Sequence, residues 1–265
     1  MTSARMSTLA TLRGRIERIE THNGALASDR VALGHAEADA ALGGGLARGA
    51  VHEVFAEAGR QSAAATGFVT GLATRITARR PLVWVRQDFS ERETGALSMS
   101  GLCEFGFDPR CLVSVRAPDA DSALRTAADA LACDALGAVV LEVWGDVRQL
   151  DLVASRKLTL AAQASGVAAL LLRLAATPQP STAETRWIVR AAHSPPAANW
   201  HAWGSPVFDA QLIRNRHGLT GRWIMEWKRD ECLFNERAAD PQPVAAAASH
   251  RPHQAEARVQ RRRAG

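Results

Sequence analysis

The residues with the clearest chemical signature lie between positions 56 and 67, after a strand-like segment and before a helix-like one. A phosphate-binding loop has the pattern G-x-x-x-x-G-K-[ST]. Its glycines bring backbone N–H groups to the phosphates, its lysine neutralises charge, and its hydroxyl binds magnesium. No lysine is present here. If Ala56 takes the first glycine position, Ser62 replaces the lysine; if Gly59 takes it, an alanine does, and Thr66 supplies the hydroxyl. Both alignments predict a phosphate loop that has lost its cation.

The segments around this loop favour an α/β fold with a mostly parallel central sheet flanked by helices. Short apolar runs, typical of strands buried on both faces, alternate with segments typical of helices. Near the end of the chain, two alternating segments joined by a polar turn predict a C-terminal β-hairpin. The predicted strands are 81–88, 111–116, 137–146 (the central one), 166–174 and 186–190, the hairpin strands are 207–214 and 221–227, and the predicted helices are 68–80, 91–107, 120–133 and 151–165.

The residues before the loop carry a resemblance to a known family. Residues 33–39, the sequence ALGGGL at 41–46 and the sequence RGAVHEVF at 48–55 resemble the entrance to the RecA core. With the lysine-free loop that follows, the chain is similar over residues 33–234 to ImuA proteins, which are RecA-like accessory factors of SOS mutagenesis. The resemblance implies a RecA-like core.

Two acidic residues belong to the same predicted site. The resemblance places Asp88 near the residue that activates water in RecA-like ATPases, although a helix cap is the simpler interpretation. Glu142 lies in the strand whose acid holds magnesium in phosphate-loop enzymes. Without the lysine these acids have little to act on. We therefore predict a vestigial nucleotide site at Gly59, Thr66, Asp88 and Glu142, with no catalytic residue, cofactor or metal.

The resemblance also implies a function and partners. ImuA-like proteins serve error-prone translesion DNA synthesis with ImuB, an inactive Y-family relative, and with an error-prone C-family DNA polymerase. RecA itself is a further candidate partner. One alternative is a weak ATPase in which Arg60 or a neighbouring subunit's arginine replaces the lysine. A second is a DNA-binding modulator of recombination. A third, resting on analogy alone, is a SulA-like inhibitor of cell division.

The two ends of the chain differ from the core in character. Residues 1–30 form a predicted amphipathic helix and linker, 31–235 the RecA-like core, and 236–265 a disordered basic tail. The helix either lies on its own domain or binds a partner, through four apolar residues at helical spacing. These partner-binding candidates are Leu9, Leu12, Ile16 and Ile19.

The formal net charge of +5 is mild, so any DNA contact is expected to be weak. The arginines of the hairpin, beside Trp223 and Trp227, could form a nucleic-acid face, but a sheet edge with one wet face is the commoner arrangement. The tail is a second place for loose DNA contact. The nucleic-acid candidates are Arg214, Arg216, Arg222, Arg261, Arg262 and Arg263.

The four cysteines, Cys103, Cys111, Cys133 and Cys232, have neither C-x-x-C spacing nor a neighbouring histidine cluster. We expect them to be small buried hydrophobic residues in a reducing compartment. No run of the sequence reaches the length of a membrane-spanning helix, and the start of the chain lacks a signal-peptide pattern. We therefore expect a cytoplasmic protein without membrane contact.

Overall fold

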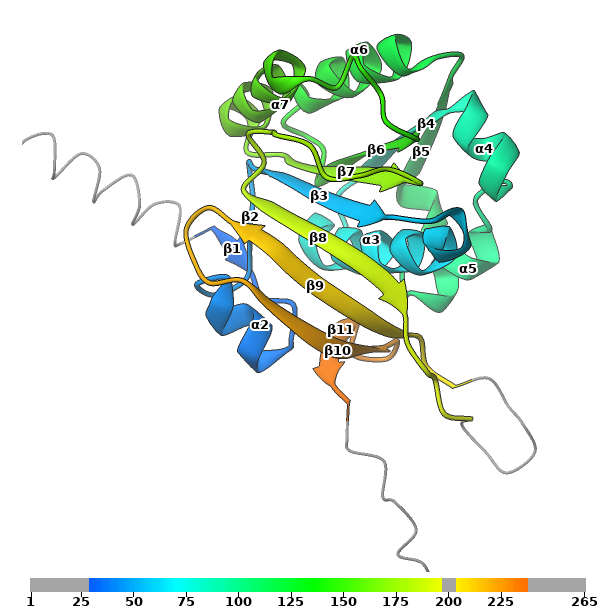
Figure 1. Cartoon of the computed structure of the whole chain (residues 1–265), viewed down its shortest axis with the longest axis vertical. Helices are drawn as coiled ribbons and strands as arrows, with labels where there is room; N and C mark the ends of the chain where they lie inside the picture. Colours follow the sequence, from blue (N-terminus) through cyan, green and yellow to red (C-terminus); the bar gives the residue numbers. More distant parts are fainter. Residues whose placement is uncertain (1–28, 197–203, 238–265) are drawn as a thin grey trace, which may run out of the picture.

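The structure is a computed structural model that describes residues 29–196 and 204–237 (Figure 1). The predicted amphipathic helix with Leu9, Leu12, Ile16 and Ile19 and the basic cluster Arg261, Arg262 and Arg263 lie outside the described residues.

A nine-stranded sheet forms the centre of the molecule, in the order β11-β10-β9-β8-β3-β7-β6-β4-β5. From β8 to β5 every neighbouring pair is parallel, whereas β8 to β11 pair antiparallel (Figure 1). The predicted fold class, including the C-terminal hairpin, is confirmed. The strands are β3 (Val51–Ala56), β4 (Leu82–Gln87), β5 (Leu112–Ala117), β6 (Ala138–Trp144), β7 (Ala168–Leu174), β8 (Thr185–Ala191), β9 (Val207–Asn215), β10 (Gly221–Lys228) and β11 (Leu233–Glu236), beside a small separate pair, β1 (Arg30–Val31) and β2 (Leu46–Ala47).

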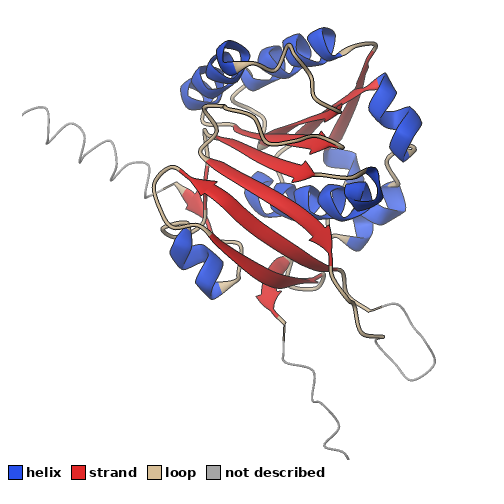
Figure 2. Ribbon diagram, viewed as in Figure 1, coloured by secondary structure: helices blue, strands red, loops and turns tan. Residues whose placement is uncertain are grey.

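Helices cover both faces of the parallel strands (Figure 2). The longest, α3 (Ser62–Thr77), packs on one face, and α6 (Ala120–Leu131) and α7 (Leu152–Ser165) pack on the other. Alternate strand residues therefore enter two separate apolar clusters; Trp84 faces α3, and Val85 faces α6 and α7. The remaining elements are α2 (Ala36–Ala41), α4 (Asp88–Thr94), α5 (Met99–Glu104) and the 3₁₀ turns η1 (Gly59–Gln61) and η2 (Pro109–Cys111). Within the described residues, no helix is long and apolar enough to cross a membrane.

Three sequence expectations differ from the structure. The predicted helix 91–107 is two helices, because α4 ends at Thr94, Gly95 adopts a φ of 82° and Ser98 caps the start of α5. The helix after the phosphate-type loop begins at Ser62, six residues earlier than expected. The middle strand of the sheet is β3, whereas the strand predicted to be central, β6, lies between β7 and β4.

Aromatic side chains attach the antiparallel strands to α3. Two glycines on that helix leave room for the rings: a Cβ on Gly67 would lie 3.4 Å from Phe208 of β9, and one on Gly71 would lie 2.6 Å from Phe234 of β11. Trp227 and Phe234 meet edge-on with centroids 4.8 Å apart. The C-terminal strands are therefore part of the same core as α3 and hold the helix that lines the candidate site.

Candidate functional site

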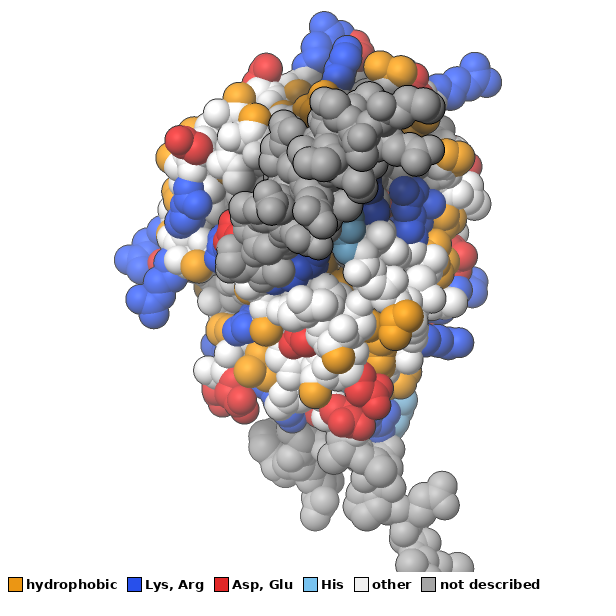
Figure 3. Space-filling model, turned by 90° about the vertical axis from the view of Figure 1, so that its left-hand side faces the viewer, with side chains coloured by type: hydrophobic (Ala, Val, Ile, Leu, Met, Phe, Trp, Pro, Cys, Tyr) orange, Lys and Arg blue, Asp and Glu red, His pale blue; other side chains and the backbone are white. Residues whose placement is uncertain are grey.

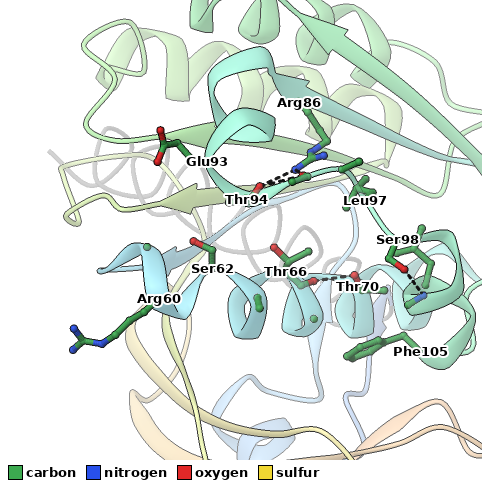
Figure 4. Close-up of a pocket in the computed structure, with 17 residues that line it drawn as sticks. Arg60, Ser62, Thr66, Thr70, Arg86, Glu93, Thr94, Leu97, Ser98 and Phe105 are labelled. Atoms are coloured by element: carbon green, nitrogen blue, oxygen red, sulfur yellow. Dashed lines mark hydrogen bonds between the residues drawn. The ribbon is translucent and has the colours of Figure 1, made fainter.

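A cavity of about 510 Å³ opens at the carboxyl ends of β3 and β4 (Figure 4). The carboxyl ends of parallel strands are the usual place for ligands in α/β sheets. One wall is the side of α3, and the facing wall is the segment from α4 to α5. The α3 wall carries Ser62, Thr66 and Thr70, and the facing wall includes Thr94, Leu97, Ser98, Leu102 and Phe105.

The loop between β3 and α3 is short. Strand β3 ends at Ala56 and α3 begins at Ser62, so the alignment that starts at Ala56 puts Ser62 at the helix start, in the lysine position of the pattern. Thr66 lies one turn further along the helix. The Oγ of Ser62 is buried and has no hydrogen-bond partner among the described residues. The preceding Gln61 does not cap the helix, because its Oε1 accepts a hydrogen bond from the N–H of Ala191 at 2.8 Å.

The cations that neighbour the loop do not point at Ser62 (Figure 4). Arg60 is exposed, and Figure 4 shows its side chain extending away from Ser62. Arg190 donates a hydrogen bond to Glu57 at 2.5 Å. Gly59 packs against the indole of Trp144, where an added Cβ would lie 3.0 Å from the ring. The loop is thus closed on one side by an aromatic ring and carries no inward-pointing lysine.

Glu142 is fully buried beneath this cavity and accepts hydrogen bonds on both oxygens. Its Oε2 accepts from Trp84 Nε1 at 2.9 Å and from Arg86 Nε at 2.8 Å. Its Oε1 accepts from Arg86 Nη2 at 2.8 Å and from Ser90 Oγ at 2.5 Å. Four donors saturate the carboxylate, so a metal ion would have to displace buried partners to reach it.

Asp88 lies apart from the other predicted site residues. It is the first residue of α4, and its Oδ1 accepts a hydrogen bond from Arg116 on β5 at 3.1 Å. Of the four residues of the predicted vestigial site, Gly59 and Thr66 line the cavity, whereas Asp88 faces the edge strand and Glu142 is covered.

Sequence reasoning missed Arg86, which connects Glu142 to the cavity wall. Its Nη2 donates to Thr94 Oγ1 and to the carbonyl of Gly95, both at 3.0 Å. Arg86 and Glu142 are direct partners across β4 and β6. The sequence did carry a signal for this pair, because β4 and β6 are apolar segments that each contain one charged residue of opposite sign. Buried charges are almost always paired.

A second buried arginine, Arg173 on β7, lies on the opposite face of the sheet. Its guanidinium stands 5.4 Å over the Phe55 ring, and its Nε and Nη2 have no hydrogen-bond partner in the described part of the chain. Burial lowers the pKa of Arg173, and the charges of Glu53 and Asp146 oppose that shift. The contact with Phe55 supplies part of the missing stabilisation.

Two of the three predicted nucleic-acid candidates of the hairpin, Arg222 and Arg214, form hydrogen bonds within the fold, and Arg216 is exposed. Arg222 forms two hydrogen bonds with Asp209, at 2.7 and 2.6 Å, and Arg214 donates to the carbonyl of Ser181 at 2.7 Å. Trp223 and Trp227 pack on the core side of β10, and Arg222 is exposed on the other side. Arg216 lines a small hollow beside His217. On the face shown in Figure 3, basic side chains are dispersed among acidic and apolar ones.

The expectation of buried cysteines is only partly met. Cys103 and Cys133 are exposed, contrary to the prediction. Cys103 lies in the last turn of α5, and Cys133 lies just beyond the end of α6. Cys111 and Cys232 are half-buried. Within residues 29–196 and 204–237, no group of three or more histidine, cysteine or acidic side chains is placed to hold a metal ion.

Comparison with known proteins identifies the family. No model of a known protein family matches the chain. Two curated relatives, each named Protein ImuA and each from a strain of Caulobacter vibrioides, are 32% identical over 199 residues. The matched region covers 69% of this chain and 77% of either relative. The chain therefore belongs to the ImuA family.

Proposed function

We propose that this protein is a non-catalytic accessory factor of SOS-induced, error-prone translesion DNA synthesis. Membership of the ImuA family supports the pathway. The observation that carries the non-catalytic part of the proposal is the saturated carboxylate of Glu142, buried with Arg86. An acid in this state is not free to hold the magnesium ion that phosphoryl transfer needs.

The loop geometry supports the same proposal. Enzymes that transfer phosphoryl groups through such a loop need a lysine on the phosphates, a metal-binding acid and a residue that orients water. Here Ser62 takes the lysine position, Glu142 is satisfied, and Asp88 is paired with Arg116. Arg60, the proposed substitute for the lysine, lines the mouth of the cavity with its side chain extended away from Ser62 (Figure 4). We infer that a RecA-like scaffold is used here for binding.

The partners we propose are an ImuB-like inactive Y-family protein, an error-prone C-family DNA polymerase and RecA. A protein-binding role is supported by exposed apolar side chains on α7, where Leu152, Val153 and Leu160 are each about half exposed or more. The predicted amphipathic helix within residues 7–20 offers a second apolar surface.

A pull-down tests the adaptor role. Purified full-length protein would be compared with variants lacking residues 1–22 or 236–265 for retention of each proposed partner. Retention of the ImuB-like protein or RecA, lost on one truncation, supports the adaptor role and locates the contact. A Leu160→Ser variant, which leaves both ends in place, reports separately on the α7 surface. Retention of none of the three partners by the full chain would overturn the proposal.

ATP turnover tests the non-catalytic part. We expect phosphate release at the background rate with magnesium and ATP, with or without single-stranded DNA. Turnover that is abolished by Thr66→Ala but unchanged in Thr74→Val, a change elsewhere on α3, would contradict the proposal and favour a weak ATPase.

A further inference from the structure

The cavity beside α3 has no role in the adaptor proposal, yet it has the size of a ligand site. Its volume of about 510 Å³ falls within the range of roughly 300–1,000 Å³ that is usual for small-molecule pockets. Its walls come from elements that the core holds firmly: α3 on one side and the Arg86-tethered segment around Thr94 and Gly95 on the other.

One end of the cavity offers an unused hydrogen-bonding group. The Ser62 hydroxyl is buried without a partner among the described residues, and Figure 4 shows it pointing from α3 towards the facing wall. It stands at the start of a 16-residue helix whose N-cap residue gives no side-chain hydrogen bond. The positive end of the helix dipole attracts an acceptor atom there. Thr66 adds a second hydroxyl one turn away.

The other end of the cavity is apolar and rigid. Phe105 lines it together with Leu97 and Leu102. The Phe105 ring is held by Phe208 and Trp227, with centroids 6.3 and 5.7 Å away. A fixed aromatic ring at the edge of an apolar wall suits a flat ring of the ligand.

The charges around the cavity favour an uncharged ligand. Arg86 lines the wall, but Glu142, Thr94 and Gly95 already accept its hydrogen bonds. Arg60 extends away from Ser62, and Glu93 stands across the opening from it (Figure 4). Arg60 lines the mouth of the cavity, so a phosphate beside Ser62 would lose water without meeting a cation that points at it (Figure 4).

We propose that this cavity binds an uncharged small molecule of nucleoside size. A flat ring would lie at the Phe105 end, and a hydrogen-bond acceptor would meet Ser62. The site would then have kept an apolar, hydroxyl-lined chamber while losing affinity for anions. This goes beyond the accessory role, which stands or falls with the partner pull-down.

Calorimetric titration of the full-length protein tests the proposal, with adenosine and thymidine as probes and magnesium–ATP as the charged comparison. We expect one nucleoside to bind more tightly than magnesium–ATP. Ser62→Ala, which removes the hydroxyl and adds no bulk, should weaken that binding about tenfold, the equivalent of one hydrogen bond. Thr74→Val, on the same helix but outside this cavity, should leave it unchanged.

Thermal unfolding of both variants separates loss of binding from loss of folding. Because Ser62 Oγ makes no hydrogen bond in the described structure, Ser62→Ala should fold at least as stably as the wild type. Tighter binding of magnesium–ATP than of either nucleoside would overturn the proposal, as would failure of both nucleosides to bind. Unchanged nucleoside affinity in Ser62→Ala would also contradict it.

Discussion

Arg86 and Glu142 face one another across two parallel strands and form a doubly hydrogen-bonded ion pair inside the sheet, with Nε–Oε2 and Nη2–Oε1 both at 2.8 Å. The same guanidinium holds the Gly95 carbonyl at 3.0 Å. One buried pair therefore joins β4, β6 and the wall of the cavity. The acid that the sequence suggested as a metal ligand has a structural partner instead.

Replacing Glu142 by alanine should destabilise the protein by about 3–5 kcal/mol, because it leaves the Arg86 charge buried without its partner. Chemical denaturation of the variant would measure the change in the free energy of unfolding. Arg116→Ala is the matched control, since Arg116 is exposed and its pair with Asp88 is worth about 0–1 kcal/mol. A loss below about 1 kcal/mol in Glu142→Ala would show that the pair is replaceable by water.

Replacing Gly71 by alanine should also destabilise the protein, although alanine is the better helix former by about 1 kcal/mol. The new Cβ would lie 2.6 Å from Phe234 and 3.0 Å from Trp227, and overpacking of this kind costs about 1–3 kcal/mol. Denaturation of Gly71→Ala, Phe234→Leu and the double variant forms a cycle. Because the smaller leucine makes room, the double variant should lose less stability than the sum of the two single changes. An additive result, or a stabilised Gly71→Ala, would contradict the packing.

The pH dependence of stability should depend on His52. Its ring lies between Thr185 Oγ1 at 2.8 Å and the Ala47 carbonyl at 2.9 Å, and burial lowers the pKa of His52. The unfolded chain then takes up a proton near pH 6.5 that the folded chain resists. Stability should therefore be full above about pH 6.5 and fall as the pH drops below it.

Urea unfolding at pH 5.5 and 7.5 measures this effect. His52→Gln should reduce the difference between the two pH values, whatever its effect on stability itself. His217→Gln should keep the wild-type difference, because His217 is exposed and the change removes the same kind of group. An equal difference in wild type and His52→Gln would rule out His52 as the source.

The strands were predictable because they are buried on both faces. Apolar runs located β4 and β7 to within two residues, although β4 ends in Arg86 and Gln87 and β7 contains Arg173. Helix starts with a capping aspartate were equally clear: Asp119 and Asp151 cap α6 and α7.

The candidate site was less predictable because tertiary contacts determine it. The start of α3 carries no capping side chain, so its boundary was placed too late. The helix break after Thr94 depends on Arg86, and Arg86 on Glu142, 56 residues away in sequence. The register between β4 and β6, which places Arg86 opposite Glu142, cannot be predicted from a local sequence pattern. The sequence therefore indicated which acidic residues could take part in a site, whereas only the structure shows the arginines that pair with them.

Any affinity for DNA should depend on the arginines of the tail more than on those of the hairpin. Arg222 is held by both oxygens of Asp209 at 2.7 and 2.6 Å, so a phosphate would have to displace a bidentate partner to bind it. Each phosphate contact on single-stranded DNA contributes about 0.7 to the slope of log affinity against log salt. Replacing Arg261, Arg262 and Arg263 by glutamine should therefore reduce that slope by about 2, whereas Arg222→Gln should leave it nearly unchanged.

Fluorescence anisotropy with a labelled oligonucleotide between about 50 and 200 mM salt would measure both slopes. A reduction of the slope in Arg222→Gln, with the tail variant unchanged, would move the contact to the outer face of β10, where Arg222 is exposed and the tryptophans are not.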